Sequence, residues 1–205
     1  MYTLYARAGW GSVLTEAQLA WYGLPYRLEE VGDLFKEKGA GEKLRTANPL
    51  MQLPTLVLPD GSAMTESAAI TLHLAEVTGR DDLVPHPPRP QFLRWLVFLV
   101  ANVYPTFTYA DDPARFVPGE AAQAAFETNV RDYAKRLWAM METASGAPWF
   151  LGERFSALDI FISAMTRWRP GRAWMVEGAP RLRAIALAAD ARPELAAVWK
   201  RNSPA

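Results

Sequence analysis

Cysteine is absent from the 205 residues of the chain. This absence excludes a disulfide framework, a zinc–thiolate site, an iron–sulfur cluster and a cysteine nucleophile. It fits a reducing compartment, so we expect a cytoplasmic protein. Histidine is scarce as well, since only His73 and His86 occur. A multi-histidine metal site needs more imidazoles than these, and we predict no metal.

Net charge and long apolar runs are also lacking. The 22 basic and 22 acidic residues balance, so nothing in the overall charge points to nucleic acid or to an acidic membrane. The N-terminal run MYTLYARAGWG does not have the pattern of a signal peptide. The most apolar run, 92–104, contains Arg94 and is shorter than the ~20 residues that span a bilayer. The 50% of hydrophobic residues excludes a disordered chain. We expect a folded protein with neither a nucleic-acid nor a membrane partner.

Strand and helix patterns alternate through the first part of the chain. Aromatic-rich alternation predicts strands at 2–6 and 26–31, with a helix between them that starts after an N-cap at Ser12 and stops at Gly23. The polar segment 32–43 predicts a short irregular helix. The run LPTLVLPDGSAMT predicts a strand, a turn at Asp60-Gly61 and a short partner strand, followed by a helix that Gly79 closes.

The composition changes after Gly79. The stretch 79–91 contains four prolines and several charges and predicts a linker. Beyond it the pattern predicts only helices, at 91–104 with Pro105 ending or kinking the first, at 118–143, at 156–168, near 181–189 and at 193–200. Ser156 and Asp159 have the spacing of a capping box. Strands before helices predict an α+β chain with a first domain at 1–79, a linker at 80–90 and an all-helical domain at 91–205.

Three polar residues, Thr65-Glu66-Ser67, stand at the predicted start of the helix that Gly79 closes. A helix N-terminus presents unpaired N–H groups and a partial positive charge, which favour a bound carboxylate or phosphate. The Ser67 hydroxyl could donate to the same anion and Glu66 could bind an ammonium group, so the pair suits an α-amino acid moiety. In the alternative, Thr65 or Ser67 only caps the helix and Glu66 only interacts with its dipole.

Two further stretches also have two interpretations. The Leu53–Pro54 bond is either an ordinary trans bond at a strand start or a cis bond that turns the Leu53 backbone outward to pair with an extended ligand. The stretch GWGS at 9–12 is a flexible loop before a helix, where Ser12 either caps the helix or receives a negative atom. Neither GxxxxGK[ST] nor GxGxxG occurs, so no phosphate-binding loop is predicted.

Taken in order, these stretches resemble a bacterial-type cytosolic glutathione transferase over almost the whole chain. The first strand, loop and helix, continued by AWYGLPYRLEEV, look like the start of that family's thioredoxin-like domain. The run NPLMQLPTLVLPDGSAMTESAAITLHLAE is similar to the family's most diagnostic segment, and FLGERFSALDIFISAMTRW to the capping box and core helix of its second domain. The resemblance implies an N-terminal thioredoxin-like α/β domain, an all-α helical domain and a homodimer.

The resemblance also implies roles for residues in glutathione binding. Glu66 and Ser67 would hold the amino and carboxylate groups of the γ-glutamyl end. The Leu53 backbone, presented by Pro54, would pair with the cysteinyl backbone, and Gln52 lies close enough in the chain to help. Either Lys36 or Lys38 would meet the glycyl carboxylate.

The family activates the glutathione thiol with a Tyr, Ser or Cys near the end of the first strand. Since the chain has no cysteine, the cysteine-dependent branches are excluded as a mechanism. Ser12 is the first candidate because it stands at the helix entry, and Tyr5 is the second. The alternatives are the indole N–H of Trp10, which otherwise walls the site, and a backbone N–H of the loop.

The implied activity is transfer of glutathione to an apolar electrophile, with glutathione as co-substrate and detoxification as the general role. Tyr104, Phe107 and Tyr109 are the candidates for lining the electrophile pocket, opposite Trp10 and with Trp168 more remote; each of them could instead serve domain packing. Two other functions stay open: a glutathione-binding or ligand-carrying protein with little turnover, and an interaction module of the same fold that does not use glutathione.

Overall fold

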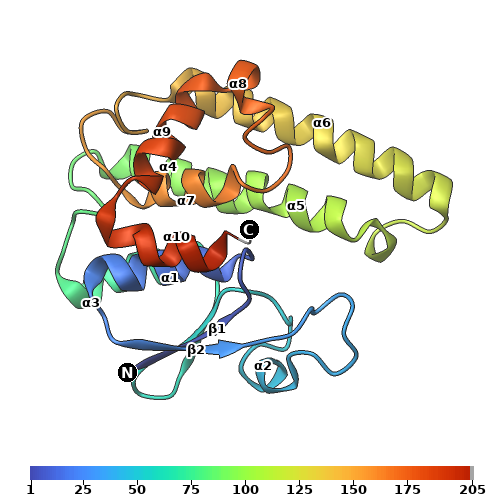
Figure 1. Cartoon of the computed structure of the whole chain (residues 1–205), viewed down its shortest axis with the longest axis horizontal. Helices are drawn as coiled ribbons and strands as arrows, with labels where there is room; N and C mark the ends of the chain where they lie inside the picture. Colours follow the sequence, from blue (N-terminus) through green and yellow to red (C-terminus); the bar gives the residue numbers. More distant parts are fainter. Residues whose placement is uncertain (204–205) are drawn as a thin grey trace. The chain divides into compact units, whose positions relative to one another are not determined.

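The computed structural model describes residues 1–203, which divide into two compact units (Figure 1). The first contains Met1–Val84 together with the segment that starts at Asp190, and the second contains Pro85–Ala189. The predicted roles, glutathione binding for 1–79 and the electrophile pocket for 91–205, stay predictions. The segment that starts at Asp190 was predicted to belong to the helical domain, but it packs with the first unit. Over residues 1–203, no helix has both the length and the apolar character needed to cross a membrane.

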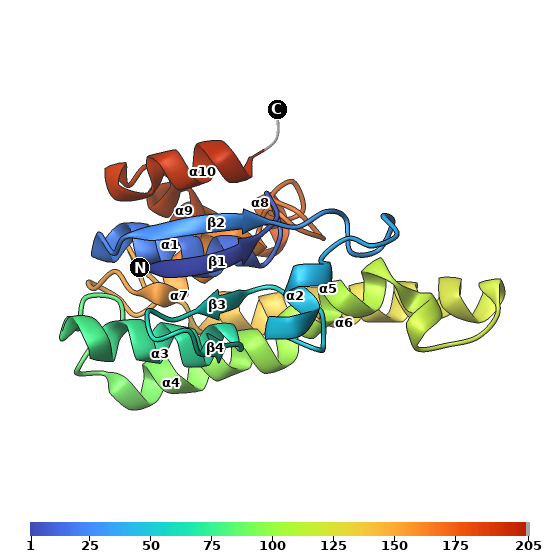
Figure 2. The same cartoon turned by 90° about the horizontal axis from the view of Figure 1, so that it is seen from below.

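The first unit is built on a four-stranded sheet, which is seen from below in Figure 2. The strands are β1 (Tyr2–Ala6), β2 (Tyr26–Glu30), β3 (Thr55–Val57) and β4 (Ala63–Met64), in the order β2-β1-β3-β4. β1 runs parallel to β2, and the β1–β3 and β3–β4 pairs are antiparallel. All four predicted strands are confirmed, with the Asp60-Gly61 turn between the last two.

Five helical segments complete the first unit. They are α1 (Ser12–Tyr22), α2 (Glu42–Ala47), α3 (Ser67–Thr78), the 3₁₀ turn η3 (Pro193–Leu195) and α10 (Ala196–Asn202). α1 contacts α3 and α10, and Figure 1 shows α10 lying along α1. Because α1 is covered on several sides, its polar side chains Thr15, Glu16 and Gln18 are buried together with its apolar ones. A buried carboxylate needs hydrogen-bond or charge partners, and those of Glu16 are Arg201 and Asn202 of α10.

Two predictions for this unit are wrong. Ser12 is not the N-cap of α1, because Gly11 occupies the cap position and Ser12 is the first helical residue. The helix predicted within 32–43 lies later, at α2, because Gly39 and Gly41 have φ values of 84° and 72°, outside the helical region. Before them, Asp33 holds a turn in which its Oδ1 accepts from the N–H of Phe35.

The second unit contains only helices and loops among its described residues. They are α4 (Arg89–Phe98), the π-helical segment η1 (Leu99–Val103), α5 (Tyr104–Asp111), the 3₁₀ turn η2 (Pro113–Arg115), α6 (Glu120–Ala144), α7 (Ala157–Met165), α8 (Met175–Gly178) and α9 (Pro180–Asp190). α6 packs along α5, and α7 packs on α4. The core includes fully buried Phe92, Trp138 and Phe161.

The prediction that Pro105 ends the helix at 91–104 is wrong, and the alternative that Pro105 kinks the helix stays a prediction. The helix continues from α4 through η1 into α5 and ends only at Asp111. Proline has no N–H to donate to the carbonyl four residues earlier, and its ring crowds that carbonyl. The π-helical segment widens the turn immediately before Tyr104-Pro105, so the chain passes the proline without breaking.

The predicted capping box at the start of α7 is confirmed. Ser156 Oγ accepts from the Leu158 N–H at 3.3 Å, and Asp159 Oδ2 accepts from the Ser156 N–H at 2.8 Å. Asp159 Oδ1 also accepts from the Phe150 N–H at 2.8 Å. Burial raises the pKa of Asp159 to about 7, although these hydrogen bonds act in the opposite direction. The native state therefore keeps a proton that an exposed aspartate would release near pH 4.

The stability of the protein should depend on pH through Asp159. Between about pH 4 and pH 7 the native state binds more protons than the unfolded chain, so the free energy of unfolding should fall as the pH rises. Urea denaturation across this range, in wild type and in Asp159→Asn, measures the effect. The difference between the two proteins should grow smaller as the pH rises. A constant difference, or one that grows with pH, would show that Asp159 is ionised throughout.

Candidate functional site

The register of the sheet brings the predicted site residues of the first unit to one end of the strands. Tyr5 pairs with Thr55, so the loop after β1 begins beside the start of β3. Leu56 pairs with Met64 in the antiparallel hairpin, and continuing this register sets Pro54 opposite Glu66. The loop at 7–11, the Leu53–Pro54 bond and the entry of α3 therefore share one edge of the sheet.

The entry of α3 is not capped by a side chain. Glu66 is the N-cap residue, and its side chain makes no capping hydrogen bond. The interpretation that Thr65 or Ser67 caps the helix is therefore wrong. Ser67 is buried, yet within residues 1–203 its hydroxyl has no hydrogen-bond partner. In the same chain α7 has a complete capping box. The first N–H groups of α3, which helix geometry leaves unpaired, are thus left for another acceptor.

Glu66 has a strained backbone. Its φ of 65° and ψ of 104° fall outside the regions that a residue with a Cβ normally adopts. Such strain costs on the order of 1–3 kcal/mol and is concentrated at functional sites. The Glu66 side chain is exposed, and its Oε1 accepts from the Thr65 hydroxyl at 3.3 Å. The strained geometry fixes an exposed carboxylate next to the open N-terminus of α3.

The Leu53–Pro54 peptide bond is cis and not trans, and the pairing of the Leu53 backbone with a ligand stays a prediction. The segment around it is held by side chains: Asn48 Nδ2 donates to the Gln52 carbonyl at 3.1 Å, and the Thr55 hydroxyl donates to the same carbonyl at 2.8 Å. Asn48 and Thr55 are both buried, whereas the Gln52 side chain is exposed. These bonds fix the backbone next to Leu53.

An apolar cluster joins the loop at 7–11 to this segment. Val31, Leu44 and Leu53 form its buried part, and Tyr5 and Trp10 pack against it. Trp10 also contacts the ring of Phe35 with centroids 5.1 Å apart.

A polar contact ties the same loop to the segment that follows β2. Arg7 forms an ion pair with Asp33 at 3.2 Å. Lys36 and Lys38 follow in this segment with exposed side chains, and Lys36 is the direct neighbour of Phe35, whose ring lies on Trp10. The Phe35–Trp10 contact brings the backbone at Lys36 to the Trp10 side of the site.

The two hydroxyls predicted to activate a thiol are already hydrogen-bonded. Ser12 is 0% exposed; its Oγ accepts from the Arg7 N–H and donates to the Arg7 carbonyl, both at 3.2 Å. The Tyr5 hydroxyl donates to the Lys43 carbonyl at 3.3 Å. The indole N–H of Trp10 has no such bond within residues 1–203, and the ring is only half-buried. Of these three side chains, only Trp10 has a donor that makes no hydrogen bond to the described residues.

The aromatic residues predicted for the electrophile pocket fall into two clusters of the second unit. Tyr104 and Phe107 contact the ring of Trp168, with ring centroids 5.6 Å and 5.0 Å from it. The prediction that Trp168 lies farther away is therefore wrong. Tyr109 instead packs with Phe116, at 4.9 Å. The structure therefore joins two of the three residues and separates the third.

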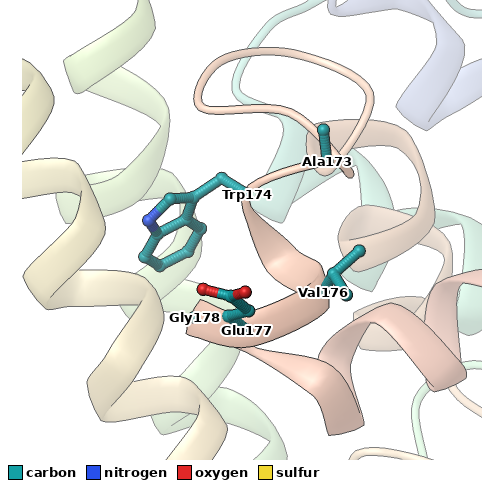
Figure 3. Close-up of a pocket in the computed structure, with 5 residues that line it drawn as sticks. All are labelled: Ala173, Trp174, Val176, Glu177 and Gly178. Atoms are coloured by element: carbon teal, nitrogen blue, oxygen red, sulfur yellow. The ribbon is translucent and has the colours of Figure 1, made fainter.

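A surface depression of the second unit is drawn in Figure 3. Its lining residues are Ala173, Trp174, Val176, Glu177 and Gly178. None of the residues predicted from the sequence is among them. Within residues 1–203, no group of three or more His, Asp or Glu side chains is arranged to hold a metal ion.

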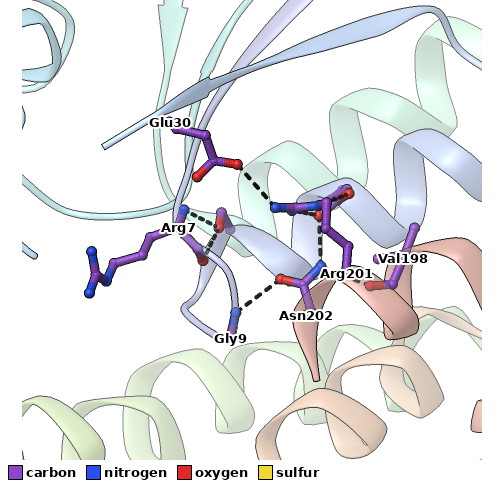
Figure 4. A network of polar contacts seen from close by, with 8 residues as sticks. Arg7, Gly9, Glu30, Val198, Arg201 and Asn202 are labelled. Atoms are coloured by element: carbon purple, nitrogen blue, oxygen red, sulfur yellow. Dashed lines mark hydrogen bonds and ion pairs between the residues drawn. The ribbon is translucent and has the colours of Figure 1, made fainter. Parts of the chain in front are cut away.

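A polar network that the sequence does not reveal joins α10 to the loop at 7–11 (Figure 4). Glu16, 2% exposed, pairs with Arg201 and accepts from Asn202 Nδ2 at 2.9 Å. Asn202 Oδ1 accepts from the Gly9 N–H at 3.1 Å, and Arg201 also contacts Glu30 at 3.2 Å. The available signal was Glu16, the one charged residue of α1, which predicts a buried charge but not its partner.

The chain is similar to known proteins in sequence and in structure. Residues 15–77 match the family model described as glutathione S-transferase, N-terminal domain. The uncharacterized GST-like protein YncG of Escherichia coli K12 is 39% identical over 206 residues, which cover 98% of each chain.

Two solved structures share the fold. A glutathione transferase homolog from Sulfitobacter, with bound glutathione, aligns with a TM-score of 0.87 at 22% identity, over 98% of this chain and 97% of that one. A sphingomonad glutathione S-transferase complexed with glutathione aligns with a TM-score of 0.78 at 25% identity, over 99% and 100%. The predicted fold, a thioredoxin-like N-terminal domain followed by a helical region, is confirmed.

Proposed function

Because the chain belongs to the glutathione S-transferase family, we propose that it binds glutathione, stabilises its thiolate and transfers it to a small apolar electrophile. The observation that carries the proposal is the uncapped entry of α3, where strained Glu66 and the unpartnered Ser67 hydroxyl stand at the same sheet edge as Leu53. An α-amino acid group has both an ammonium and a carboxylate, which these residues complement.

The proposed contacts follow the length of glutathione. Glu66 binds the γ-glutamyl ammonium, and Ser67 with the first N–H groups of α3 binds the γ-glutamyl carboxylate. The Leu53 backbone next to Pro54 pairs with the cysteinyl backbone, with the exposed Gln52 side chain beside it. Lys36, which follows Phe35 in the segment next to Trp10, is the proposed partner of the glycyl carboxylate, with Trp10 as one wall of the site.

Thiolate stabilisation needs only a modest energy. A free thiol has a pKa of about 8.5, and lowering it by about 2 units requires about 2.7 kcal/mol of preference for the thiolate. One hydrogen bond to a charged group supplies about 1.5–3 kcal/mol. A single donor at this end of β1 is therefore sufficient, and the candidates remain Ser12, Tyr5, Trp10 and a backbone N–H of the loop at 7–11.

Ser12→Ala and Trp10→Phe separate these donors. Because the Ser12 hydroxyl is buried and bonded to Arg7, its removal should leave the pKa of the bound thiol nearly unchanged and should lower the melting temperature. Trp10→Phe keeps a ring and removes the indole N–H, so it should raise the thiol pKa by about 1–2 units, the value of one hydrogen bond to a charged group. The thiolate absorbance of the complex, titrated against pH, gives each value. A rise in Ser12→Ala alone would instead assign the role to Ser12.

The electrophile is proposed to meet aromatic side chains of the second unit. Tyr104 and Phe107 form an edge-to-face cluster with Trp168, which suits an apolar, planar group. Tyr109 stays a candidate, although it belongs to the neighbouring cluster around Phe116. A cytoplasmic homodimer acting in detoxification completes the proposal.

A second function is favoured by one observation. Since both hydroxyls predicted to act on the thiol are bonded to backbone carbonyls, the chain could bind glutathione and turn it over little, as a carrier. Calorimetry with glutathione tests binding, and assays with an aryl halide and an isothiocyanate test turnover. Binding with turnover supports the transferase, and binding without turnover of either substrate supports the carrier. The absence of binding would overturn both and leave an interaction module of this fold.

A further inference from the structure

We propose that Asn202, the last residue of α10, is a positioning residue for the glutathione thiol, acting through the Gly9 N–H and the loop that carries Trp10. The proposal rests on the proposed function. It concerns a contact between positions 9 and 202, inside the first unit, that closes the loop after β1 with a side chain from the end of the chain (Figure 4).

The chemistry of the partners fixes the orientation of the Asn202 amide. Its Oδ1 faces the Gly9 N–H at 3.1 Å, and its Nδ2 lies 2.9 Å from Glu16 Oε2 and 2.9 Å from the Val198 carbonyl. An N–H can only donate, and a carboxylate and a carbonyl can only accept. The reverse orientation would set amine against N–H and oxygen against oxygen. All three contacts are therefore satisfied in one orientation only.

Asn202 is itself held rigidly. It is 4% exposed, and the carboxylate that receives its Nδ2 is the buried Glu16, which Arg201 neutralises. Arg201 also bonds Glu30 at the end of β2. The Asn202 side chain thus links α1 and α10 to the loop, because the buried members of the network, Glu16 and Asn202, are both hydrogen-bonded and the Glu16 charge is paired.

Gly9 is the point where this contact controls the loop. Its φ of 77° is a left-handed conformation that glycine adopts without steric cost. An external contact restricts the conformations that such a residue can adopt. The next residue, Trp10, packs in the cluster that contains Leu53, where the cysteinyl backbone is proposed to bind. Fixing Gly9 therefore fixes the indole and the loop N–H groups relative to the thiol.

Asn202→Ala tests the proposal, with Val198→Ala as the matched control on the same helix. Val198 is equally buried, and its substitution keeps the Asn202 side chain and the backbone carbonyl that it contacts. Both variants should lower the melting temperature. Only Asn202→Ala should raise the KM for glutathione and the pKa of the bound thiol, with a threefold to tenfold loss of thiolate fraction at neutral pH, about the value of one hydrogen bond.

Hydrogen exchange of the Gly9 amide supplies a readout that does not use glutathione. The amide should exchange at least about threefold faster in Asn202→Ala than in Val198→Ala, because only the first loses the acceptor. Equal exchange, or equal thiol pKa and KM in the two variants, would overturn the positioning role while leaving the proposed function intact. If wild type does not bind glutathione, the proposed function fails, and this inference fails with it.

Discussion

Glu66→Gln and Ser67→Ala should each weaken glutathione binding by about ten- to a hundredfold, measured as Kd by calorimetry. Each substitution removes a proposed hydrogen bond to a charged group of the ligand, and such a bond is worth about 1.5–3 kcal/mol. Glu66→Gln also removes the negative charge that is proposed to face the γ-glutamyl ammonium. The structure adds that neither residue caps α3, so these losses should come with little change in stability.

Glu76→Gln is the matched control for the first of these variants. Glu76 lies on α3 and is exposed. Its substitution by Gln changes the charge of the chain by the same amount as Glu66→Gln. Its Kd should equal that of wild type, since the residue lies near the other end of α3. If Glu66→Gln bound glutathione as tightly as Glu76→Gln, the proposed contact with the ammonium group would be wrong. If Ser67→Ala lost several kcal/mol of stability instead of affinity, the serine would be structural.

The second large effect should be on stability. Arg201→Met should lower the free energy of unfolding by about 2–4 kcal/mol, measured by urea denaturation. It leaves the carboxylate of Glu16 buried without its cation, which is the costly way to break an ion pair. Arg201 is 27% exposed, so the loss should stay below that of a fully enclosed pair. The carboxylate keeps the Asn202 contact, which also limits the loss.

Two further variants check the origin of this loss. Replacing both partners, Glu16→Leu with Arg201→Met, should recover part of the stability, because no unpaired charge is then buried. Lys135→Met removes a cation from the exposed pair with Asp132 and should cost at most about 1 kcal/mol. If Arg201→Met were no worse than Lys135→Met, Glu16 would be solvated or protonated, and the network would not hold α10 on α1.

Local signals explain why much of the fold was predictable from the sequence. The strands at 2–6 and 26–31 show alternation, the Asp60-Gly61 turn has its own residue signature, and Gly23 and Gly79 stop their helices in the left-handed conformation. The capping box at Ser156 is a pattern of neighbouring residues. Each of these features depends on contacts within a few positions of the chain, which a sequence displays directly.

The parts that escaped prediction depend on distant contacts. The Asn202–Gly9 bond joins residues 193 positions apart, and the Trp168 ring meets Tyr104 only once the helices of the second unit have packed. Ser12 is a residue type that favours the N-cap position, but its hydroxyl is hydrogen-bonded to the N–H and the carbonyl of Arg7, in the loop before the helix. The sequence pattern alone could not decide whether Ser12 or Trp10 is the better hydrogen-bond donor to the glutathione thiolate.

A crystal structure of the protein with glutathione bound tests the central claim most directly. We expect the γ-glutamyl ammonium within hydrogen-bond distance of Glu66, the γ-glutamyl carboxylate on Ser67 and the first N–H groups of α3, and the cysteinyl backbone paired with Leu53. The sulfur should then face the loop that carries Trp10. Glutathione bound away from the entry of α3, with Glu66 and Ser67 making no contact to it, would contradict the account.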